Sequence, residues 1–186
     1  MTTTHIIGID DAPFPKRHRG NVLVVGSVFT GCRLDGVLCG DVRRDGVNAT
    51  DRLIDLIGTS RFHGHLQLVM LQGIALAGFN VVDIWKLRNA LDLPVLVICR
   101  KRPDLAAVAK ALLEKVPGGR RKWRLIQRAG EMEPVAGVYI QRAGIDLEQA
   151  SEVIRKTAKH SVIPEPLRTS HIIARGITRH PGRHRV

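Results

Sequence analysis

Residues 5–15 read HIIGIDDAPFP, in which three isoleucines and a glycine lead into the adjacent acids Asp10 and Asp11, and prolines follow at once. The apolar run predicts a buried strand over residues 5–10, because a strand covered on both faces is apolar along its length. Paired carboxylates at the end of such a strand place negative charge at one edge of a sheet. A turn formed with Pro13 is the structural alternative, but Asp10 ends the strand directly and we take it as functional.

The segments that follow indicate an α/β domain. Strands are expected over residues 21–29 and 36–42, with short connections that favour antiparallel hairpins. Helices and strands then alternate, which predicts a mixed sheet flanked by helices on both faces, as in an RNase H-like fold. Further strands are expected at 66–71, 93–99, 123–127 and 135–140, and helices are expected from about 48, 81, 103, 146 and 164. We expect a single domain over residues 1–178 and a basic tail over residues 179–186.

Charge and cysteine content narrow the class of protein. The chain of 186 residues carries 29 Lys and Arg against 17 Asp and Glu, a net charge of +12. Such an excess favours a polyanionic partner, usually nucleic acid, although a solubility charge is the alternative. Three cysteines without metal-ligand spacing, and no signal peptide, predict free thiols in a cytoplasmic protein. No apolar run reaches the length of a membrane span, so no membrane partner is expected.

Aspartates near expected strand ends and helix starts form a candidate metal site. Magnesium prefers oxygen ligands and takes one or two carboxylates together with substrate phosphates, and nucleases use such ions to activate water. We therefore expect Mg²⁺, with Mn²⁺ as a substitute. Asp45 could instead form a turn with Gly46, and a helix N-terminus could explain Asp51, which we take as structural, or Asp83, which stays open. The candidates are Asp10, Asp11, Asp45, Asp51 and Asp83.

Clusters of Lys and Arg adjoin several of these strand ends and predict contacts to phosphates, although a cationic run can also be a solvated face. Phe79 and Asn80, in a Gly-rich turn before a helix, could shape a pocket for a base or a phosphate, or form a helix cap with one core aromatic. Trp123, among four cations, could stack on an unpaired base, but we expect it to be a half-buried strand residue. The expected nucleic-acid-binding residues are Lys16, Arg17, Arg44, Phe79, Asn80, Arg102, Arg121 and Lys122.

Five short segments, taken in order, form a recognisable set. They read GIDDAPF (8–14), DGVNATD (45–51), LAGFNVVDIWKL (76–87), LPVLVI (93–98) and IPEPLRTSHIIA (163–174). Together they resemble the archaeal endonuclease dU family, once uncharacterised and related to endonuclease V. The resemblance runs from about residue 5 to residue 178 and implies an RNase H-like fold and cleavage of DNA near deoxyuridine.

The relation to endonuclease V implies roles for single residues. Asp10 resembles the first catalytic aspartate of that family, and Asp45 falls at its second carboxylate. The segment LPVLVICRK resembles one that ends in a lysine, so Arg100 or Lys101 would supply that positive charge. The Pro-Glu-Pro-x-Arg turn before the last helix also matches, and we expect its Glu165 and Arg168 to form an architectural ion pair.

Departures from endonuclease V leave part of the site open. Gln72 stands where that family has an aspartate at the end of its fourth strand, so the third carboxylate is either Asp83 or Asp11. The tyrosine-containing wedge and the late active-site histidine before Asp146 have no match, which weakens the case for inosine recognition more than the case for cleavage. His171 is expected to be an ordinary core or surface histidine.

These observations predict a divalent-metal-dependent endodeoxyribonuclease that nicks DNA near deaminated bases, deoxyuridine first among them. The alternative is a catalytically inactive RNase H-like protein that binds nucleic acid, which Gln72 favours, and RNA is an alternative substrate. The expected catalytic residues are Asp10, Asp45, Asp83, Arg100 and Lys101, and the expected metal ligands are Asp10, Asp11, Asp45 and Asp83.

Overall fold

A computed structural model of the chain describes residues 3–179, and of Arg179 the backbone alone. The basic tail expected over residues 179–186 therefore lies outside the described residues, apart from that backbone. Among the described residues, no helix combines the length and the hydropathy that crossing a membrane requires.

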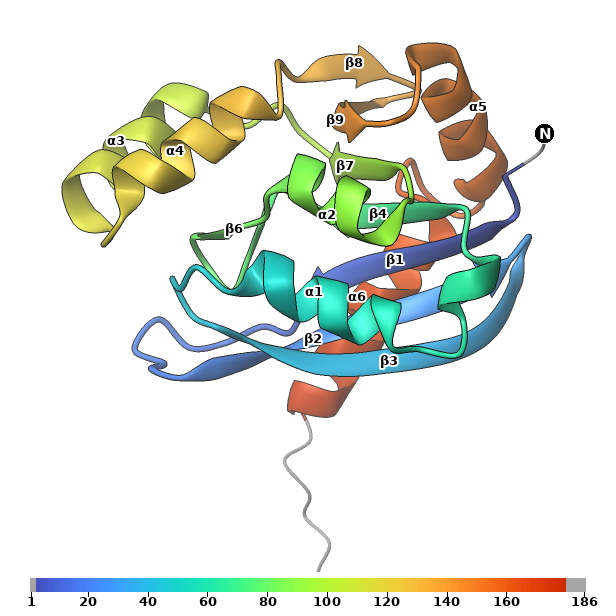
Figure 1. Ribbon diagram of the computed structural model, residues 1–186, viewed down its shortest axis with the longest axis horizontal. Helices are drawn as coiled ribbons and strands as arrows, with labels where there is room; N and C mark the ends of the chain where they lie inside the picture. The colour runs from blue at the N-terminus through green and yellow to red at the C-terminus, as the bar shows by residue number, and fades with distance from the viewer. Residues whose placement is uncertain (1–2, 180–186) are drawn as a thin grey trace, which may run out of the picture.

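Across residues 3–179, seven strands form one mixed sheet in the order β3-β2-β1-β4-β7-β9-β8 (Figure 1). Strands β1, β4 and β7 are parallel, β2 is antiparallel to both β1 and β3, and β9 is antiparallel to β7 and β8. The antiparallel hairpins and the mixed sheet predicted from the sequence are thus confirmed. The strands are β1 His5–Asp11, β2 Asn21–Thr30, β3 Arg33–Arg43, β4 Leu68–Gln72, β7 Val95–Cys99, β8 Glu133–Val135 and β9 Val138–Ala143.

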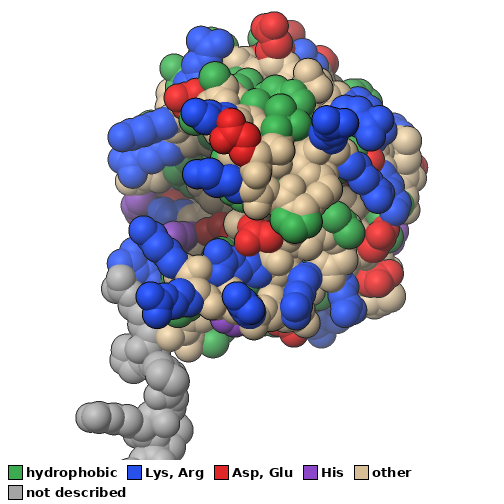
Figure 2. Space-filling view, turned by 90° about the vertical axis from the view of Figure 1, so that its left-hand side faces the viewer, with side chains coloured by type: hydrophobic (Ala, Val, Ile, Leu, Met, Phe, Trp, Pro, Cys, Tyr) green, Lys and Arg blue, Asp and Glu red, His purple; other side chains and the backbone are tan. Residues whose placement is uncertain are grey.

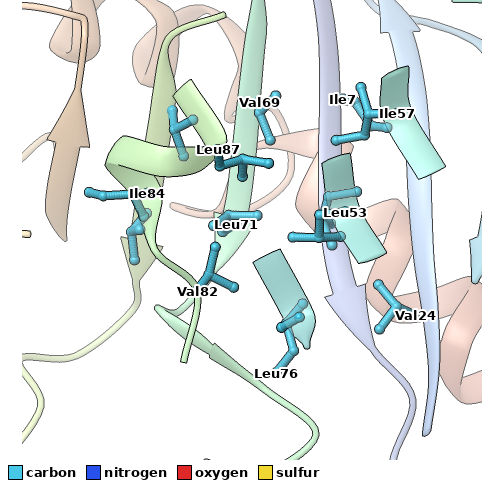
Figure 3. Packing of buried hydrophobic residues seen from close by; sticks show 14 of the residues in the cluster. Ile7, Val24, Leu53, Ile57, Val69, Leu71, Leu76, Val82, Ile84 and Leu87 are labelled. Atoms are coloured by element: carbon cyan, nitrogen blue, oxygen red, sulfur yellow. The ribbon is translucent and has the colours of Figure 1, made fainter. Parts of the chain in front are cut away.

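Helices cover both faces of this sheet. One face packs against α1 and α2 through an aliphatic core that includes Ile7, Leu53 and Leu87 (Figure 3). The other face packs against α5 and α6 through a second core, to which Ile6 and Leu167 belong. The sheet helices are α1 Ala49–Gly58, α2 Ile84–Leu91, α5 Leu147–Thr157 and α6 Glu165–Arg179, with a short 3-10 helix, η1, at His63–His65. Asp146 caps α5 in a capping box with Gln149, as the sequence predicts.

A helical hairpin, made of α3 Leu105–Lys115 and α4 Gly119–Arg128, projects from the same end of the molecule as the arrowhead of β1 (Figure 1). The strand expected over residues 123–127 is therefore wrong, and Trp123 lies on a helix. Gly118 is the N-cap of α4 and lies in the left-handed region with a φ of 70°. The buried residues Lys122 and Ile126 then recur every four positions, which is a helical period.

The topology brings the carboxyl ends of four strands to one edge of the sheet. β3 runs parallel to β1 because each is antiparallel to β2, and β4 and β7 run in the same direction. Residues that follow these strands therefore gather at this edge, which we call the carboxyl edge. It receives Asp10 and Asp11 from β1, Asp45 after β3, Gln72 from β4, and the cations that follow β7.

Candidate active site at the carboxyl edge

Asp10 is a buried carboxylate that contacts a histidine from a distant helix. Its residue is 5% exposed, and its Oδ2 lies 2.8 Å from Nδ1 of His171 on α6. Its Oδ1 accepts a hydrogen bond from the backbone N–H of Asp11. The imidazole is about half exposed, with 53% of its side-chain surface accessible. The pair therefore joins a buried acid to a group that solvent or a ligand can reach.

The carboxylates at the end of β1 are difficult to ionise. Burial raises the pKa of Asp10 to about 6; the hydrogen bond from His171 opposes this, and the nearby charge of Asp11 adds to it. Burial also raises the pKa of Asp11. Desolvated acids that repel one another favour the binding of a cation, which would lower both pKa values.

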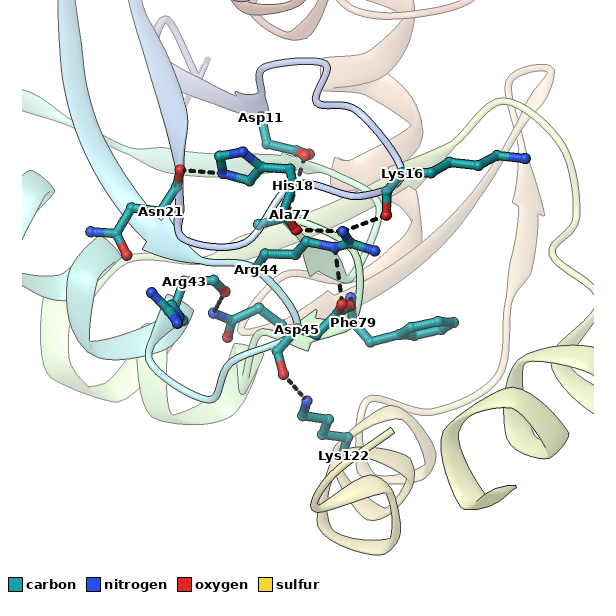
Figure 4. A network of polar contacts seen from close by, with 11 residues as sticks. Asp11, Lys16, His18, Asn21, Arg43, Arg44, Asp45, Ala77, Phe79 and Lys122 are labelled. Carbon is teal, nitrogen blue, oxygen red and sulfur yellow. Dashed lines mark hydrogen bonds and ion pairs between the residues drawn. The ribbon is translucent and has the colours of Figure 1, made fainter. Parts of the chain in front are cut away.

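Asp11 and Asp45 hold the tip of a small hairpin (Figure 4). The hairpin is formed by β5 Ala75–Leu76 and β6 Asn80–Val81, and we call residues 77–79 the hairpin tip. Oδ2 of Asp11 accepts from the N–H of Ala77 at 3.1 Å, and Oδ1 of Asp45 accepts from the N–H of Phe79 at 2.9 Å. The N–H of Asp45 donates to the carbonyl of Ala77. These two aspartates therefore meet through one loop.

Strand alternation separates Asp10 from this arrangement. Successive side chains of a strand point to opposite faces of the sheet. Gly8, two residues before Asp10, faces α6, and Asp10 contacts His171 on the same helix. Asp11 instead points to the face that carries the hairpin tip. The charges of Asp10 and Asp11 still affect one another, so the two acids lie close although they point apart.

The remaining acidic candidates are engaged elsewhere. Asp83 caps α2 by accepting from the N–H of Lys86 and forms an ion pair with Arg128 of α4. Asp51 lies in the first turn of α1 and pairs with Lys86. Gln72 is a half-buried residue at the end of β4. The structure thus brings Asp10, Asp11, Asp45 and Gln72 to the carboxyl edge, while the contacts of Asp83 tie it to α2 and α4.

Cations surround this edge. Figure 2 shows a face of the molecule on which Lys and Arg side chains gather around a hollow that contains acidic and histidine side chains. Arg100, Lys101 and Arg102 are exposed directly after β7, and Lys16 and Arg17 are exposed in the loop after β1. Arg121 is exposed on α4. These positions suit contacts to the phosphates of a polyanion.

Two of the expected nucleic-acid-binding cations have structural partners. Lys122 is 1% exposed, because the helical period of α4 turns it inward, so its expected contact with a phosphate is wrong. Nη1 of Arg44 donates to the carbonyls of Lys16 and His18, and its guanidinium lies over the ring of Phe14. Arg44 therefore shapes the loop after β1.

The residues of the Gly-rich turn divide into one that is reachable and one that is buried. Phe79 is half buried at the hairpin tip. Asn80 is fully buried, accepts from the N–H of Ala49 and donates to the carbonyl of Arg43. Asn80 thus connects the turn after β3 to the hairpin, and Phe79 is the member of the pair that a base could contact.

Sequence reasoning missed His171. No local pattern pairs this histidine with Asp10, 161 residues away, because the contact arises from the way α6 crosses β1. The available signals were Gly8 and Ser170. A Cβ on Gly8 would lie 2.4 Å from the backbone of Pro166, and the hydroxyl of Ser170 donates to the carbonyl of Gly8. The ion pair of Glu165 with Arg168 was predicted and is present.

A divalent cation at the carboxyl edge would have few protein ligands. Within residues 3–179, no three His, Cys, Asp or Glu side chains converge in a way that could hold a metal, so the four expected ligands do not form one cluster. Mg²⁺ commonly needs only one or two carboxylates because water and substrate oxygens complete its shell. Asp10, with the charge of Asp11 close by and with His171 beside it, fits that mode of binding.

The comparisons with known sequences cover nearly the whole chain. A family model described as Endonuclease dU matches residues 2–178. A UPF0215 protein of Deinococcus radiodurans is 55% identical over 176 residues, which are 95% of this chain and 90% of that protein. A UPF0215 protein of Methanothermobacter thermautotrophicus is 46% identical over 177 residues, 93% and 87% of the two chains. The family model and both relatives thus match this chain over nearly its whole length.

Solved structures share the fold. A protein of unknown function from Archaeoglobus fulgidus has a TM-score of 0.87 and 32% identity, and the match covers 94% of this chain and 98% of that one. Endonuclease V of Ciona intestinalis, solved with a 24mer DNA containing an inosine followed by a ribo-adenosine, has a TM-score of 0.61 and 11% identity over 95% and 86%. Human ENDOV has a TM-score of 0.57 and 19% identity over 95% and 85%. The RNase H-like fold predicted from the sequence is thus confirmed.

Proposed function

The chain belongs to the endonuclease dU family, and on that premise we propose that it is a divalent-metal-dependent endonuclease that hydrolyses phosphodiester bonds in DNA near deaminated bases, with deoxyuridine as the preferred base. The observation that carries the proposal is the contact of the buried Asp10 with the half-exposed His171 at a carboxyl edge surrounded by cations. The base preference follows the name of the family.

The residues at the carboxyl edge would have different roles in such a reaction. Asp10, with the charge of Asp11 close by, would hold Mg²⁺ or Mn²⁺. The bound cation would activate a water molecule and polarise the phosphate. His171 keeps Nδ1 on Asp10 while its exposed ring exchanges a proton with water or with the departing oxygen.

The cations of the edge bind and orient the substrate. Arg100 and Lys101 follow β7 directly and would contact the non-bridging oxygens of the reacting phosphate, while Lys16, Arg17 and Arg102 would contact its neighbours. Phe79 would lie against an unpaired base, because an aromatic ring stacks on any base. Asp45 acts through the hairpin tip that carries Phe79.

A nicking assay tests this proposal. End-labelled duplexes that contain one deoxyuridine, one deoxyinosine or neither are incubated with the protein in MgCl₂, in MnCl₂ and in EDTA. We expect a metal-dependent nick in the deoxyuridine duplex, and a loss of rate of about a hundredfold or more for Asp10→Asn, because loss of a ligand exceeds the usual cost of changing an outer-shell partner.

A matched control is Asp92→Asn. Asp92 is a C-cap whose side chain is 92% exposed, and it lies in the left-handed region that Asn tolerates. This variant is expected to nick at the wild-type rate. Folded wild-type protein that nicks neither modified duplex in either metal contradicts the proposal.

The second candidate is an RNase H-like protein that binds nucleic acid without cleaving it. Gln72 favours it, because an amide at the end of β4 brings no negative charge to the carboxyl edge. Tight, salt-sensitive binding to DNA or RNA oligonucleotides, with no cleavage of any of them and no effect of Asp10→Asn, would identify this function. Cleavage of the RNA members of the panel alone would identify an RNA-processing nuclease.

A further inference from the structure

Lys122 is a buried charged group that the proposed mechanism does not use. It lies on α4, is 1% exposed, and ranks among the largest fully buried side chains of the described residues. Its Nζ donates to the main-chain carbonyl of Asp45 at 2.5 Å. A buried ammonium is unfavourable unless it is paired and hydrogen-bonded, so its placement calls for a role in the fold or in the site.

Asp45, whose carbonyl accepts the hydrogen bond from Lys122, also forms hydrogen bonds with the hairpin tip. Asp45 lies in the left-handed region with a φ of 51°. Its N–H donates to the carbonyl of Ala77, and its Oδ1 accepts from the N–H of Phe79 (Figure 4). A Cβ on Gly78 would lie 2.4 Å from that same Oδ1. The carboxylate therefore fits closely against the hairpin tip.

The hairpin tip in turn reaches the acids of β1. The N–H of Ala77 donates to Asp11, whose charge raises the pKa of the neighbouring Asp10. An unbroken series of hydrogen bonds thus connects α4 with the end of β1. It starts at Lys122 and passes through Asp45 and Ala77 to Asp11.

The α3–α4 hairpin packs on the β5–β6 hairpin through a small apolar cluster. Val81 of β6, Leu112 of α3 and Ile126 of α4 form its buried part, and Phe79 is packed against it. The last turn of α4 is held by the ion pair of Arg128 with Asp83 and by the indole N–H of Trp85, which donates to the carbonyl of Arg128. Lys122 lies six residues before Arg128, where α4 passes the carboxyl edge.

We propose that Lys122 is a positioning residue, which anchors the α3–α4 hairpin on the carbonyl of Asp45 and thereby fixes the hairpin tip, with Phe79, against Asp11 at the carboxyl edge. This inference rests on the proposed function for its kinetic consequence, because the hairpin tip matters to catalysis only if the carboxyl edge cleaves DNA. The structural link itself is independent of that function.

The test compares Lys122→Met with Ile126→Ala. Methionine keeps an unbranched side chain that ends at the position of Cε, and it removes the ammonium group with its charge and its hydrogen bond. Ile126 lies four residues later on the buried face of α4 and is 4% exposed, so its truncation weakens the packing of the hairpin and leaves the ammonium on Asp45. The first readout is hydrogen exchange of the Ala77 and Phe79 amides, measured by NMR on the full chain without DNA or metal.

Lys122→Met is expected to raise the exchange rate of both amides about tenfold or more, whereas Ile126→Ala is expected to leave them within about twofold. On the deoxyuridine duplex, Lys122→Met is expected to lower kcat about tenfold with KM changed less than threefold, because the exposed cations that supply most of the affinity remain. Ile126→Ala is expected to keep kcat within about twofold at temperatures well below its unfolding.

Gly78→Ala serves where Lys122→Met does not fold. It separates the hairpin tip from Asp45 and leaves Lys122 intact, and we expect the same rise in exchange and the same loss of kcat. A folded Lys122→Met with unchanged exchange overturns the inference, as does equal exchange in Lys122→Met and Ile126→Ala. Wild-type protein that cuts no duplex overturns the proposed function, while the exchange experiment still decides the role of Lys122.

Discussion

At the scale of one residue, burial of the Asp10 carboxylate lowers the stability of the folded chain at neutral pH. Burial and the charge of Asp11 raise its pKa to about 6, from 3.8 for a free side chain. Between these two values the folded chain binds more protons than the unfolded chain. Stability therefore falls as the pH rises through this window, and the full penalty is present above it. A ligand that brings positive charge would remove that penalty.

Asp10→Asn is expected to stabilise the metal-free protein at neutral pH. Asparagine keeps the shape and a partner for His171 but carries no charge. The difference between the two pKa values corresponds to about 3 kcal/mol as an upper limit, so we expect a gain of about 1–3 kcal/mol at pH 7.5 that shrinks towards pH 4. Urea unfolding in EDTA at both pH values measures it. Asp92→Asn should show no such pH dependence, and a variant less stable than the wild type at pH 7.5 refutes the prediction.

Single residues were predictable where the signal was local. Asp10 and Asp11 were found because they end an apolar strand, and Asp45 because it follows an expected strand, and the structure brings all three to one edge. His171 was missed because its partner is set by the crossing of a helix and a strand. The direction of Lys122 was missed because a cationic run gives no sign of which member is buried.

At the scale of an element, helix α6 shows that the position of a site residue depends on how closely a helix packs on a strand. It carries His171 to Asp10, and it can do so because the strand beneath it has a glycine. A Cβ on Gly8 would lie 2.4 Å from the carbonyl carbon of Pro166 and 2.6 Å from the nitrogen of Leu167. These are backbone atoms and cannot rotate away. The hydroxyl of Ser170 further fixes the distance by donating to the carbonyl of Gly8.

Gly8→Ala is therefore expected to push α6 away from β1. Overpacking of this kind costs about 1–3 kcal/mol, and a loss of at least about 2 kcal/mol is expected because the obstacle is main chain. Gly176→Ala is the control on the same helix. A Cβ on Gly176 would have no neighbouring atom within 4 Å, and an exposed helical glycine replaced by alanine gains up to about 1 kcal/mol. Urea unfolding of both variants decides, and equal stabilities would contradict the role given to Gly8.

Elements were predictable where the apolar period was long, and not where it was short. Strands β1, β2, β4 and β7 and helices α1, α5 and α6 follow from runs whose period is clear. The single strand expected over residues 135–140 is wrong, because this segment contains the turn between β8 and β9. Residues 123–127 contain apolar side chains at 123, 125 and 126, which fit a short strand or one helical turn equally well. The sequence Pro117-Gly118-Gly119 was interpreted as the end of α3, and it is also the start of α4.

At the scale of the whole molecule, strand order turns scattered residues into one surface. The first three strands pair with their neighbours in the chain as antiparallel hairpins, and later connections place β4 and β7 parallel to β1. Because β1, β3, β4 and β7 run the same way, their acids and the cations after β7 share one edge. What the sequence could not show is how neighbours on a strand divide between faces at that edge, which separates Asp10 from Asp11.

The carboxyl edge should therefore dominate binding of DNA even though positive charge is spread over the molecule. Each phosphate contact that is lost lowers the slope of log affinity against log salt by about one. The double variant Arg100→Ser with Lys101→Ser is expected to reduce that slope by up to about 2. Fluorescence anisotropy of a labelled duplex in EDTA, over a series of NaCl concentrations, measures it without cleavage.

A double variant at the opposite edge tests whether place or total charge matters. Arg33 of β3 lies opposite Thr30 of β2 in the strand register, and Thr30 lies opposite His5 at the start of β1. Arg33 is therefore at the edge of the sheet opposite the carboxyl edge. Arg61 lies over the ring of Phe62, which packs against Gly36 near the start of β3. Arg33→Ser with Arg61→Ser removes the same charge as the first pair, and we expect it to leave the slope unchanged. If both double variants lowered the salt slope equally, DNA affinity would depend on net charge alone. That result would contradict the assignment of the carboxyl edge as the surface that binds DNA.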